Sequence, residues 1–447
     1  MPSSRGQFSC RVGFVMAAAG SAVGLGNIWG FPTQVADNGG AAFVLVYLVL
    51  TFFLAYPVFM AELIIGRYGQ ANVATSLQKM SRNLFHKRLA FIIGSGGILV
   101  ASLVLSFYII IAGWMMSHSV EPLARIVGFT NLADWVVSES SLRSILFSAI
   151  FMYLTFYIIQ KGVEGIEKWS KRLMPLLIIL LIILIIYVLT LEGANEGLAA
   201  YLQPDFSRVF EPNLIISALG QAFFSLSVGA GLNVIYGSYI SKKESLISLG
   251  TQVTLIDVSI AFLAGLLIIP AMYVAQTQGI VIFSEDGSLI SGPTIIFTVL
   301  PNLFSSMGAI GLLVTFIFFV LMSVAALTTT IAILETAVSY VIERYSLARK
   351  KASVLIAAVI LGVSTLIASN IEWMLGIVVI IATQYGLPII ALLTCLFVGW
   401  IWHRNEILEE LRQGSNDVEN SLFWKIWPWY IKFICPAAIA MVFYHSL

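Results

Sequence analysis

Three acidic residues lie inside long apolar runs of this sequence: Glu62, Asp257 and Glu335. A charged side chain is costly to place in such a run, so each acid is a candidate functional group. Glu62 is best explained as a structural acid that accepts hydrogen bonds from backbone amides released by broken helices. Glu335 allows two interpretations: a similar structural bond, or the transfer of a proton.

Two of the apolar runs contain residues that disrupt helices. The stretch AGSAVGLGNIWGFP (19–32) carries three glycines, an asparagine and a proline, and FFSLSVGAGLN (223–233) repeats the pattern in a later run. A single glycine in a membrane helix usually serves close packing. A break at membrane depth is tolerated where it lines a protein cavity, and its free carbonyls and amides suit small ions. The two stretches therefore predict a buried binding site made by two discontinuous helices.

The composition defines the environment of these elements. Of the 447 residues, 59% are apolar and 11% are charged, and the mean hydropathy is +0.95. Apolar runs of about 20 residues are long enough to cross a bilayer as helices. We expect an all-α polytopic membrane protein with eleven spans, the first retained rather than cleaved as a signal peptide. The runs are 11–34, 41–66, 89–117, 144–160, 171–190, 213–240, 248–275, 306–342, 351–369, 373–402 and 424–446.

Lysine and arginine residues are divided unevenly between the two sides of this topology. With the N-terminus cytoplasmic, the external connections hold only Arg125, Arg143 and Arg208. The bias predicts a cytoplasmic N-terminus and an external C-terminus. The net charge is only +1, so this uneven distribution indicates the lipid bilayer, and not nucleic acid, as the partner. The three cysteines have no metal-ligand spacing, and no nucleophile elbow or phosphate loop appears, so no enzyme is expected.

Four motifs occur in the order found in a known family: AGSAVGLGNIWGFP at 19–32, GRYG at 66–69, GQAFFSLSVGAG at 220–231 and AALTTTIAI at 325–333. They resemble the neurotransmitter:sodium symporter family, in particular its eleven-helix bacterial amino-acid transporters of the LeuT fold. The resemblance runs from Arg5 to the tenth helix.

The resemblance implies a fold as well as a family. Residues 1–447 would form a single transmembrane transporter domain of the LeuT fold, with helices 1 and 6 discontinuous. Two inverted five-helix repeats would occupy about 8–190 and 213–402, followed by an eleventh helix at about 424–446.

The resemblance also implies two sodium sites built from hard oxygen ligands. The first would be completed by the carboxylate of the substrate and would use Ala22, Asn27, Ser225 and Asp257. The second would combine backbone carbonyls with two hydroxyls and would use Gly20, Val23, Ala325, Thr328 and Thr329. Taken alone, the hydroxyls of Thr328 and Thr329 are better explained by bonds to their own helix.

Asp257 carries a further expectation about chloride. It lies 32 residues after Ser225, the family's interval to an asparagine that binds sodium, although counting back from Pro270 shifts the register by one. If the assignment holds, the aspartate supplies the negative charge that animal relatives obtain from chloride. Transport would then not require chloride.

The resemblance identifies the substrate through the polarity of its pocket. Gly24 stands where amine-transporting relatives place an aspartate, which leaves room for the carboxylate of an α-amino acid. Ala230 replaces the phenylalanine of a leucine-sized pocket, so we expect a large apolar or aromatic side chain. The implied substrate-binding residues are Ser21, Ala22, Gly24, Leu25, Gly26, Val104, Tyr108, Phe224, Ser225, Ser227, Ala230, Thr329 and Ile333.

The gates are only partly those of the family. The usual WRFP is WGFP here, so Gly30 replaces the arginine of an outer salt bridge, and its acidic partner position is Met374. The outer gate would then depend on the rings of Tyr108 and Phe224. The inner gate is implied to use Arg5, Glu343 and Tyr239.

The fifth span holds a further element that resembles the family. Gly165 and Pro175 have the spacing of a segment that unwinds to let water reach the second sodium. Alternatively, Pro175 marks the start of a helix.

The leading hypothesis is a sodium-coupled symporter of an α-amino acid that works by alternating access with two sodium ions. It would lie in the inner (plasma) membrane of a bacterial cell as a multi-pass protein. A proton-coupled carrier of the same fold is the alternative that Asp257 and Glu335 support. A non-transporting amino-acid sensor is the alternative that the altered outer gate supports. The oligomeric state does not follow from the sequence.

Overall fold

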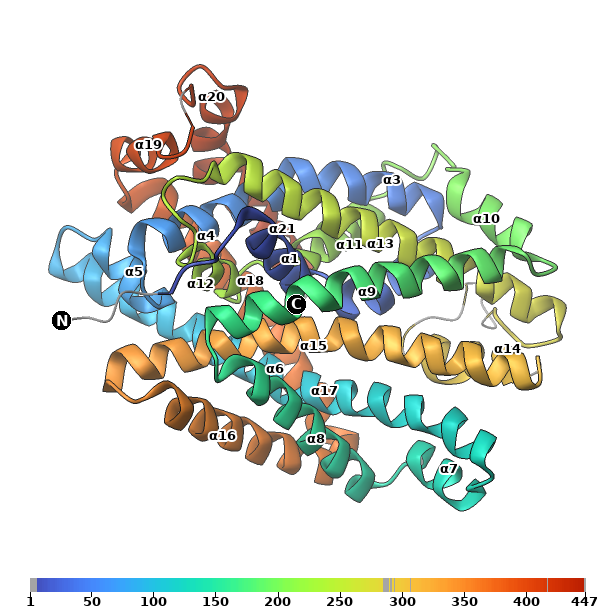
Figure 1. The fold of residues 1–447 in the computed structure, drawn as a ribbon. Coiled ribbons are helices and arrows are strands. Elements are labelled where there is room, and N and C mark those ends of the chain that lie inside the picture. Colours follow the sequence, from blue (N-terminus) through green and yellow to red (C-terminus); the bar gives the residue numbers. More distant parts are fainter. Residues whose placement is uncertain are drawn as a thin grey trace.

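The computed structural model of the chain describes residues 6–283, 289, 292, 294–305, 307–415 and 417–445. Within this part, the regular structure is helical apart from one isolated bridge between Phe283 and Leu289. Figure 1 shows long helices that cross the molecule in roughly the same direction, with shorter helices at both ends. The predicted all-α class is confirmed.

The first half of the chain begins with a helix that is interrupted after its third turn. Its helices are α1 (Arg11–Ala22), α2 (Phe31–Asp37), α3 (Ala41–Leu50), α4 (Tyr56–Gly69), α5 (Val73–Lys79), α6 (Leu84–Val127), α7 (Thr130–Val137), α8 (Ser141–Ile159) and α9 (Val163–Leu189). Turns of π-helix at Gly26–Gly30 and Thr51–Ala55 lead into α2 and α4.

The second half also contains an interrupted helix near its start. Its helices are α10 (Ala194–Leu202), α11 (Pro212–Ser225), α12 (Leu232–Gly237), α13 (Leu246–Thr277), α14 (Leu300–Ser305), α15 (Ala309–Tyr345), α16 (Arg349–Ser369), α17 (Ile371–Val379), α18 (Leu387–Leu396), α19 (Arg404–Arg412), α20 (Leu422–Trp429) and α21 (Cys435–His445). The interrupted helix is formed by α11 and α12, after the short α10. Turns of π-helix at Ile295–Val299, Ile380–Gly386, Phe397–Ile401 and Tyr430–Ile434 lie before α14, on both sides of α18 and between α20 and α21.

The expected spans correspond to these helices. Nine helices among the described residues are long and apolar enough to cross a membrane, and α1 with the Gly26–Asp37 helix forms a tenth span bent by 53°. The remaining run, 213–240, corresponds to α11 and α12, which are separated by residues 226–231. Both predicted discontinuous helices are therefore present.

Local sequence explains why the longest helix starts and stops where it does. The Asn83 side chain accepts a hydrogen bond from the amide of His86 at 2.7 Å and so caps the start of α6. Gly128 follows the last turn at a φ of 87°, a left-handed conformation that glycine adopts at little cost. The helix runs for 44 residues between these caps, well beyond the expected 89–117, so its ends extend past the apolar run.

The start of α9 differs from the predicted span. The run 171–190 began at the first long apolar segment, but α9 begins at Val163 and includes Pro175 in its interior. The alternative that Pro175 starts a helix is therefore wrong. The segment between Gly165 and Pro175 is helical in this conformation, and its unwinding stays a prediction.

The two breaks meet in the centre of the bundle. Helix α11 contacts α2 and the π-helical turn Gly26–Gly30, and α12 contacts α1. The long helix α15 runs beside α6 and α9 across the molecule, as Figure 1 shows, and also contacts α1. The core of the fold therefore surrounds the two segments whose backbone groups lack helical partners.

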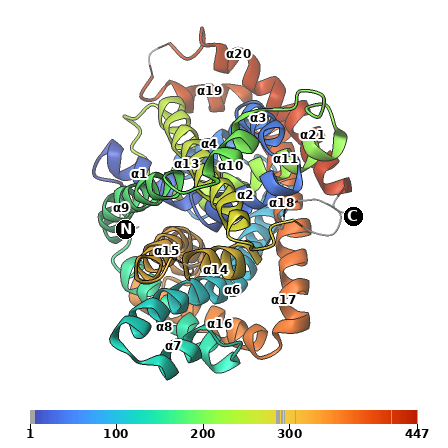
Figure 2. The same cartoon turned by 90° about the vertical axis from the view of Figure 1, so that its right-hand side faces the viewer.

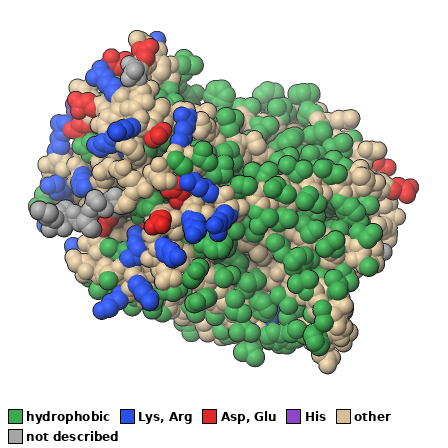
Figure 3. All heavy atoms as spheres, in the orientation of Figure 1, with side chains coloured by type: hydrophobic (Ala, Val, Ile, Leu, Met, Phe, Trp, Pro, Cys, Tyr) green, Lys and Arg blue, Asp and Glu red, His purple; other side chains and the backbone are tan. Residues whose placement is uncertain are grey.

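The surface separates charge from apolar side chains. Figure 3 shows hydrophobic side chains over the middle and right of one face, whereas lysine and arginine gather towards the left, where α5 and α19 lie in Figure 1. Helix α17 has no buried residues, and Figure 2 shows it at the edge of the bundle. An apolar face of this width is typical of a protein that contacts lipid.

Candidate substrate and ion site

The first oxygen cluster joins the two breaks to α13. The Asn27 amide donates to Asp257 Oδ1 at 2.8 Å and to Ser225 Oγ at 3.0 Å. Ser225 Oγ donates to Asp257 Oδ2 at 2.7 Å. The structure thus brings together three of the four residues predicted for the first sodium site, with Asp257 and not its neighbour facing Ser225. Ala22 lines the adjoining pocket.

A second oxygen cluster lies between α1 and α15. Thr328 Oγ1 lies 2.9 Å from the Ala325 carbonyl of its own helix and 3.4 Å from the Val23 carbonyl at the break. Thr329 Oγ1 lies 3.5 Å from the same Val23 carbonyl. A Cβ placed on Gly20 would lie 3.2 Å from the Thr328 side chain. The five residues predicted for the second sodium site are therefore neighbours, and the hydroxyls contact both helices.

The pocket between these clusters has a cavity of about 50 Å³. All of the predicted substrate-binding residues line it except Ser21, Leu25 and Ser225. Three residues that the sequence did not identify complete the wall: Ala101, Leu232 and Leu387. In the sequence, apolar residues that line a pocket have the same helical spacing as residues of the core, so the two cannot be distinguished.

Two of the residues outside the wall lie directly behind it. The Leu25 amide donates to the Tyr108 hydroxyl at 3.0 Å. This hydroxyl therefore accepts a hydrogen bond from an amide at the break in the first helix. The Ser21 hydroxyl is buried and has no hydrogen-bond partner among the described residues. A buried hydroxyl without a partner is unusual, so Ser21 is a candidate to bind a polar ligand.

Glu62 holds the second break in place. Its carboxylate accepts the Gly229 amide at 2.9 Å and the Asn233 side-chain amide at 2.8 Å. Among the described residues, these bonds go to the sixth span only, whereas the sequence suggested bonds to both broken helices. The acid therefore replaces the helical partners that residues 226–231 have lost.

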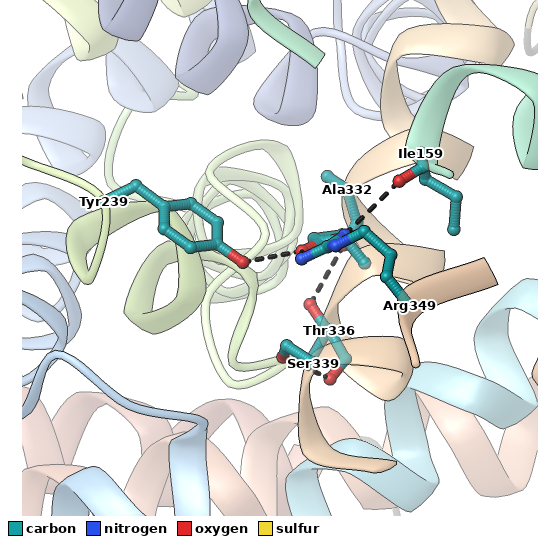
Figure 4. Close-up of polar contacts among 7 residues, drawn as sticks. Ile159, Tyr239, Ala332, Thr336, Ser339 and Arg349 are labelled. Atoms are coloured by element: carbon teal, nitrogen blue, oxygen red, sulfur yellow. Dashed lines mark hydrogen bonds and ion pairs between the residues drawn. The ribbon is translucent and has the colours of Figure 1, made fainter. Parts of the chain in front are cut away.

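Glu335 lies in a separate network in the last third of α15. Its carboxylate accepts the Tyr239 hydroxyl at 2.6 Å and forms an ion pair with Arg349 at 2.8 Å. Figure 4 shows Tyr239 and Arg349 approaching from opposite sides, with Arg349 also directed at the Ile159 carbonyl. Of the two interpretations of Glu335, this ion pair favours the structural bond.

The inner gate is only partly within the described residues, because Arg5 lies outside them. Glu343 accepts two hydrogen bonds from Asn72, at 2.9 Å from its backbone amide and 2.7 Å from its side chain. The Phe8 amide donates to the Tyr239 carbonyl at 3.2 Å, and the Phe8 ring contacts the Tyr239 ring edge-on. The segment before α1 is thus attached to the end of the sixth span.

The predicted outer pair, Tyr108 and Phe224, does not stack in this conformation. Tyr108 is buried, whereas Phe224 is 39% exposed, and a Cβ on Gly26 would lie 2.8 Å from the Phe224 ring. The ring therefore lies over the break in the first helix. Near Gly30, the closest side chain is Gln221, whose amide donates to the Gly26 carbonyl at 2.8 Å. The gating role of Tyr108 and Phe224 stays a prediction.

An aromatic cluster that the sequence did not reveal lies beyond the pocket along α6. The Phe297 ring contacts Trp29, Trp114 and His118 with ring centroids 5.0–6.3 Å apart. Along α6, Trp114 and His118 lie about 9 and 15 Å from Tyr108 at 1.5 Å per residue. The cluster joins the Gly26–Gly30 turn, α6 and the Ile295–Val299 turn by ring contacts.

Among the ion pairs that the sequence did not reveal, two involve buried side chains, one beside Ser9 near the start of the chain and one in the GRYG motif. Glu167 of α9 pairs with Lys171 at 2.5 Å and accepts the Ser9 amide at 2.8 Å. Arg67 of the GRYG motif is buried and pairs with Glu410 of α19 at 2.6 Å. Arg67 belongs to a motif found in the sequence, but no motif or residue spacing marks Glu410, which lies in the connection before the last span.

A pocket at the breaks of two helices, beside two clusters of oxygen atoms in a bundle with a lipid-facing surface, defines a membrane transport protein. The solved structure of MhsT in complex with L-phenylalanine is similar over 99% of this chain and 100% of that chain, with 35% identity and a TM-score of 0.84. The predicted LeuT fold is confirmed by this similarity.

The model of the sodium:neurotransmitter symporter family matches residues 5–149 and 131–447, so the chain belongs to this family. It is 33% identical to the uncharacterised sodium-dependent transporter YhdH of Bacillus subtilis over 98% of this chain and 96% of that one. It is 28% identical to the sodium- and chloride-dependent taurine transporter of Bos taurus over 68% of this chain and 56% of that one. The family prediction is confirmed, and the protein is a sodium-dependent transporter.

Proposed function

We propose that this protein is a sodium-coupled symporter of a large apolar or aromatic α-amino acid that does not require chloride. The observation that carries the proposal is the contact of Asn27, Ser225 and Asp257 beside an apolar pocket. A sodium ion at this cluster would be bound by oxygen atoms and by one negative charge, and the substrate carboxylate would share it.

The pocket supports the substrate class. With glycine at position 24, the pocket has no acid there to pair with a substrate that carries an amine but no carboxylate. The position also has no space for a larger residue, because a Cβ would lie 2.4 Å from Thr329 Oγ1 and 2.8 Å from the Tyr108 hydroxyl. Amide and hydroxyl donors at Leu25 and Tyr108 suit a carboxylate. The wall on the side of Val104, Ala230 and Ile333 is apolar. The similar MhsT structure contains L-phenylalanine, which agrees with a ring-bearing substrate.

Two sodium ions, a cytoplasmic N-terminus and a bacterial inner membrane belong to the same proposal. The second ion would use the Val23 and Ala325 carbonyls with Thr328 and Thr329, whose hydroxyls already face those carbonyls. The gathering of lysine and arginine at one end of the molecule supports the orientation. Two inverted repeats would each begin with one of the two broken helices.

A proton-coupled carrier is the second candidate, and Asp257 favours it. This carboxylate is buried, and its partners among the described residues are the neutral Asn27 and Ser225. An acid in such surroundings exchanges protons as well as cations. Glu335 gives this candidate less support because Arg349 neutralises it.

Uptake by purified protein in proteoliposomes tests both candidates. Labelled amino acids would be screened under an imposed sodium gradient, then with choline in place of sodium and gluconate in place of chloride. We expect uptake of large apolar amino acids that stops in choline and continues in gluconate. Uptake driven by a pH gradient without sodium would establish the second candidate instead.

A further inference from the structure

Two apolar cavities lie side by side in this protein and share two side chains. The substrate pocket, of about 50 Å³, includes Phe224 and Leu387 in its wall. A second cavity, of about 180 Å³, has the same two side chains in its wall and continues between α11, α18 and α21. Phe224 and Leu387 are the residues common to both walls, and their side chains can change rotamer without a change of fold.

The position of Leu387 is set by close packing on both sides. Gly229, in the second break, has a φ of 88°, and a Cβ there would lie 2.4 Å from the Leu387 carbonyl. On the other side, a Cβ on Gly386, the residue before Leu387, would lie 2.8 Å from the Val100 side chain of α6. Leu387 is therefore held at the junction of α6, α18 and the broken sixth span, and it lines both cavities.

The volumes decide which cavity holds a ring. An apolar cavity of about 150 Å³ is sufficient to bind benzene. The substrate pocket is too small for a ring in this conformation, whereas the second cavity is large enough for one. Phe224 is 39% exposed, so its ring is not fixed by packing on all sides.

We propose that the second cavity is an annex of the substrate pocket that receives the ring of an aromatic amino acid when Leu387 and Phe224 turn aside. The inference rests on the proposed function, because it requires an amino acid bound at the first break. It makes Leu387, from the tenth span, a determinant of side-chain size. Small amino acids would use the pocket alone, and ring-bearing ones would use both cavities.

Val442 of α21 provides the sharpest test, since it lines the annex and not the substrate pocket. The experiment is competition by alanine, leucine, phenylalanine and tryptophan against labelled uptake in proteoliposomes. In Val442→Phe the new ring would fill the annex, and we expect the inhibition constant of tryptophan to rise about tenfold while that of alanine changes little. The neighbouring Met441, which is 53% exposed, gives the control Met441→Phe, in which no constant should change.

Leu387→Ala tests the same inference in the opposite direction. Removing this side chain joins the two cavities, so tryptophan should gain affinity relative to alanine. Equal changes for all four amino acids in both variants, or a tryptophan constant unaffected by both, would overturn the annex while leaving the symporter intact. An unmodified protein that transports no amino acid would overturn the proposed function and the annex together. If Val442→Phe fails to fold, the ratio measured for Leu387→Ala decides.

Discussion

Two buried acids of this protein, Glu335 and Asp257, lie in regions with opposite electrostatics. In the last third of α15, Glu335 is neutralised by Arg349 at 2.8 Å. At the breaks, Asp257 is equally buried but is surrounded by the neutral groups of Asn27 and Ser225. A buried charge without a partner is unfavourable. The comparison shows one buried acid paired with a cation of the protein and another held by neutral groups, and only the second suits the sodium ion of the proposed function.

Replacing the acid at the breaks should have the largest effect on transport. Asp257→Asn removes the only charge of the first oxygen cluster, and breaking a buried charge pair costs about 3–5 kcal/mol. We expect sodium-driven uptake to fall at least about 100-fold, with partial recovery in high chloride if an anion can take the place of the carboxylate. Uptake measured against sodium concentration, in chloride and in gluconate, checks this.

The control for this prediction is Glu372→Gln, which removes an exposed acid of α17. It should leave sodium dependence unchanged. Normal sodium dependence in Asp257→Asn would show that the two regions do not differ in the way described above.

Removing the cation of the other region should affect stability instead. Arg349→Gln leaves Glu335 buried without its partner, and because the Arg349 side chain is 30% exposed, we expect a loss of about 2 kcal/mol. Thermal unfolding of the purified protein measures this loss. The double variant Glu335→Gln/Arg349→Gln should recover part of it, and a sodium affinity that falls in parallel would contradict the separation of the two regions.

Filling the substrate pocket should change selectivity more than affinity for sodium. Ala230→Phe places a ring in the substrate pocket, and overpacking costs about 1–3 kcal/mol. We expect tryptophan to compete less well while glycine and alanine compete normally. Ala358→Phe, on the exposed face of α16, is the control, and an equal loss for all substrates would remove Ala230 from the pocket wall.

The smallest effect is expected at the second oxygen cluster. Thr328→Val removes one hydroxyl among several oxygen atoms, a loss of about 1 kcal/mol, so the half-saturating sodium concentration should rise about fivefold. In the control Thr330→Val, the lost hydroxyl contacts Thr155 of α8 at 3.1 Å and not the break. The same shift in both variants would mean that Thr328 acts through its helix and not through sodium.

Much of the site was visible in the sequence because it depends on local composition. Several glycines clustered with an asparagine inside one apolar run favour a helix break, so residues 19–32 and 223–233 indicated both breaks. The spacing of Ser225 and Asp257 left a choice of register. The hydrogen bond from Ser225 to Asp257 at 2.7 Å shows which residue faces the break.

The partners of the buried charges were not visible in the sequence. Arg67 and Glu410 are 343 positions apart, and Arg349 lies in the helix after the one that holds Glu335. The local pattern around each of these residues is the same whether a partner exists or not. The start of α9 was missed for a related reason: its first turns are polar and bear Glu167, whose partners Ser9 and Lys171 supply the compensation.

The sequence by itself determined the class of the protein, its helical spans and the two positions at which helices break, because these follow from hydropathy and from the conformational limits of glycine and proline. Tertiary structure alone decided that Glu335 is paired with Arg349 while Asp257 contacts neutral side chains, and that Leu387 lines two neighbouring cavities. The physical reason is that burial and pairing are properties of packed neighbours, and those neighbours are distant in the chain.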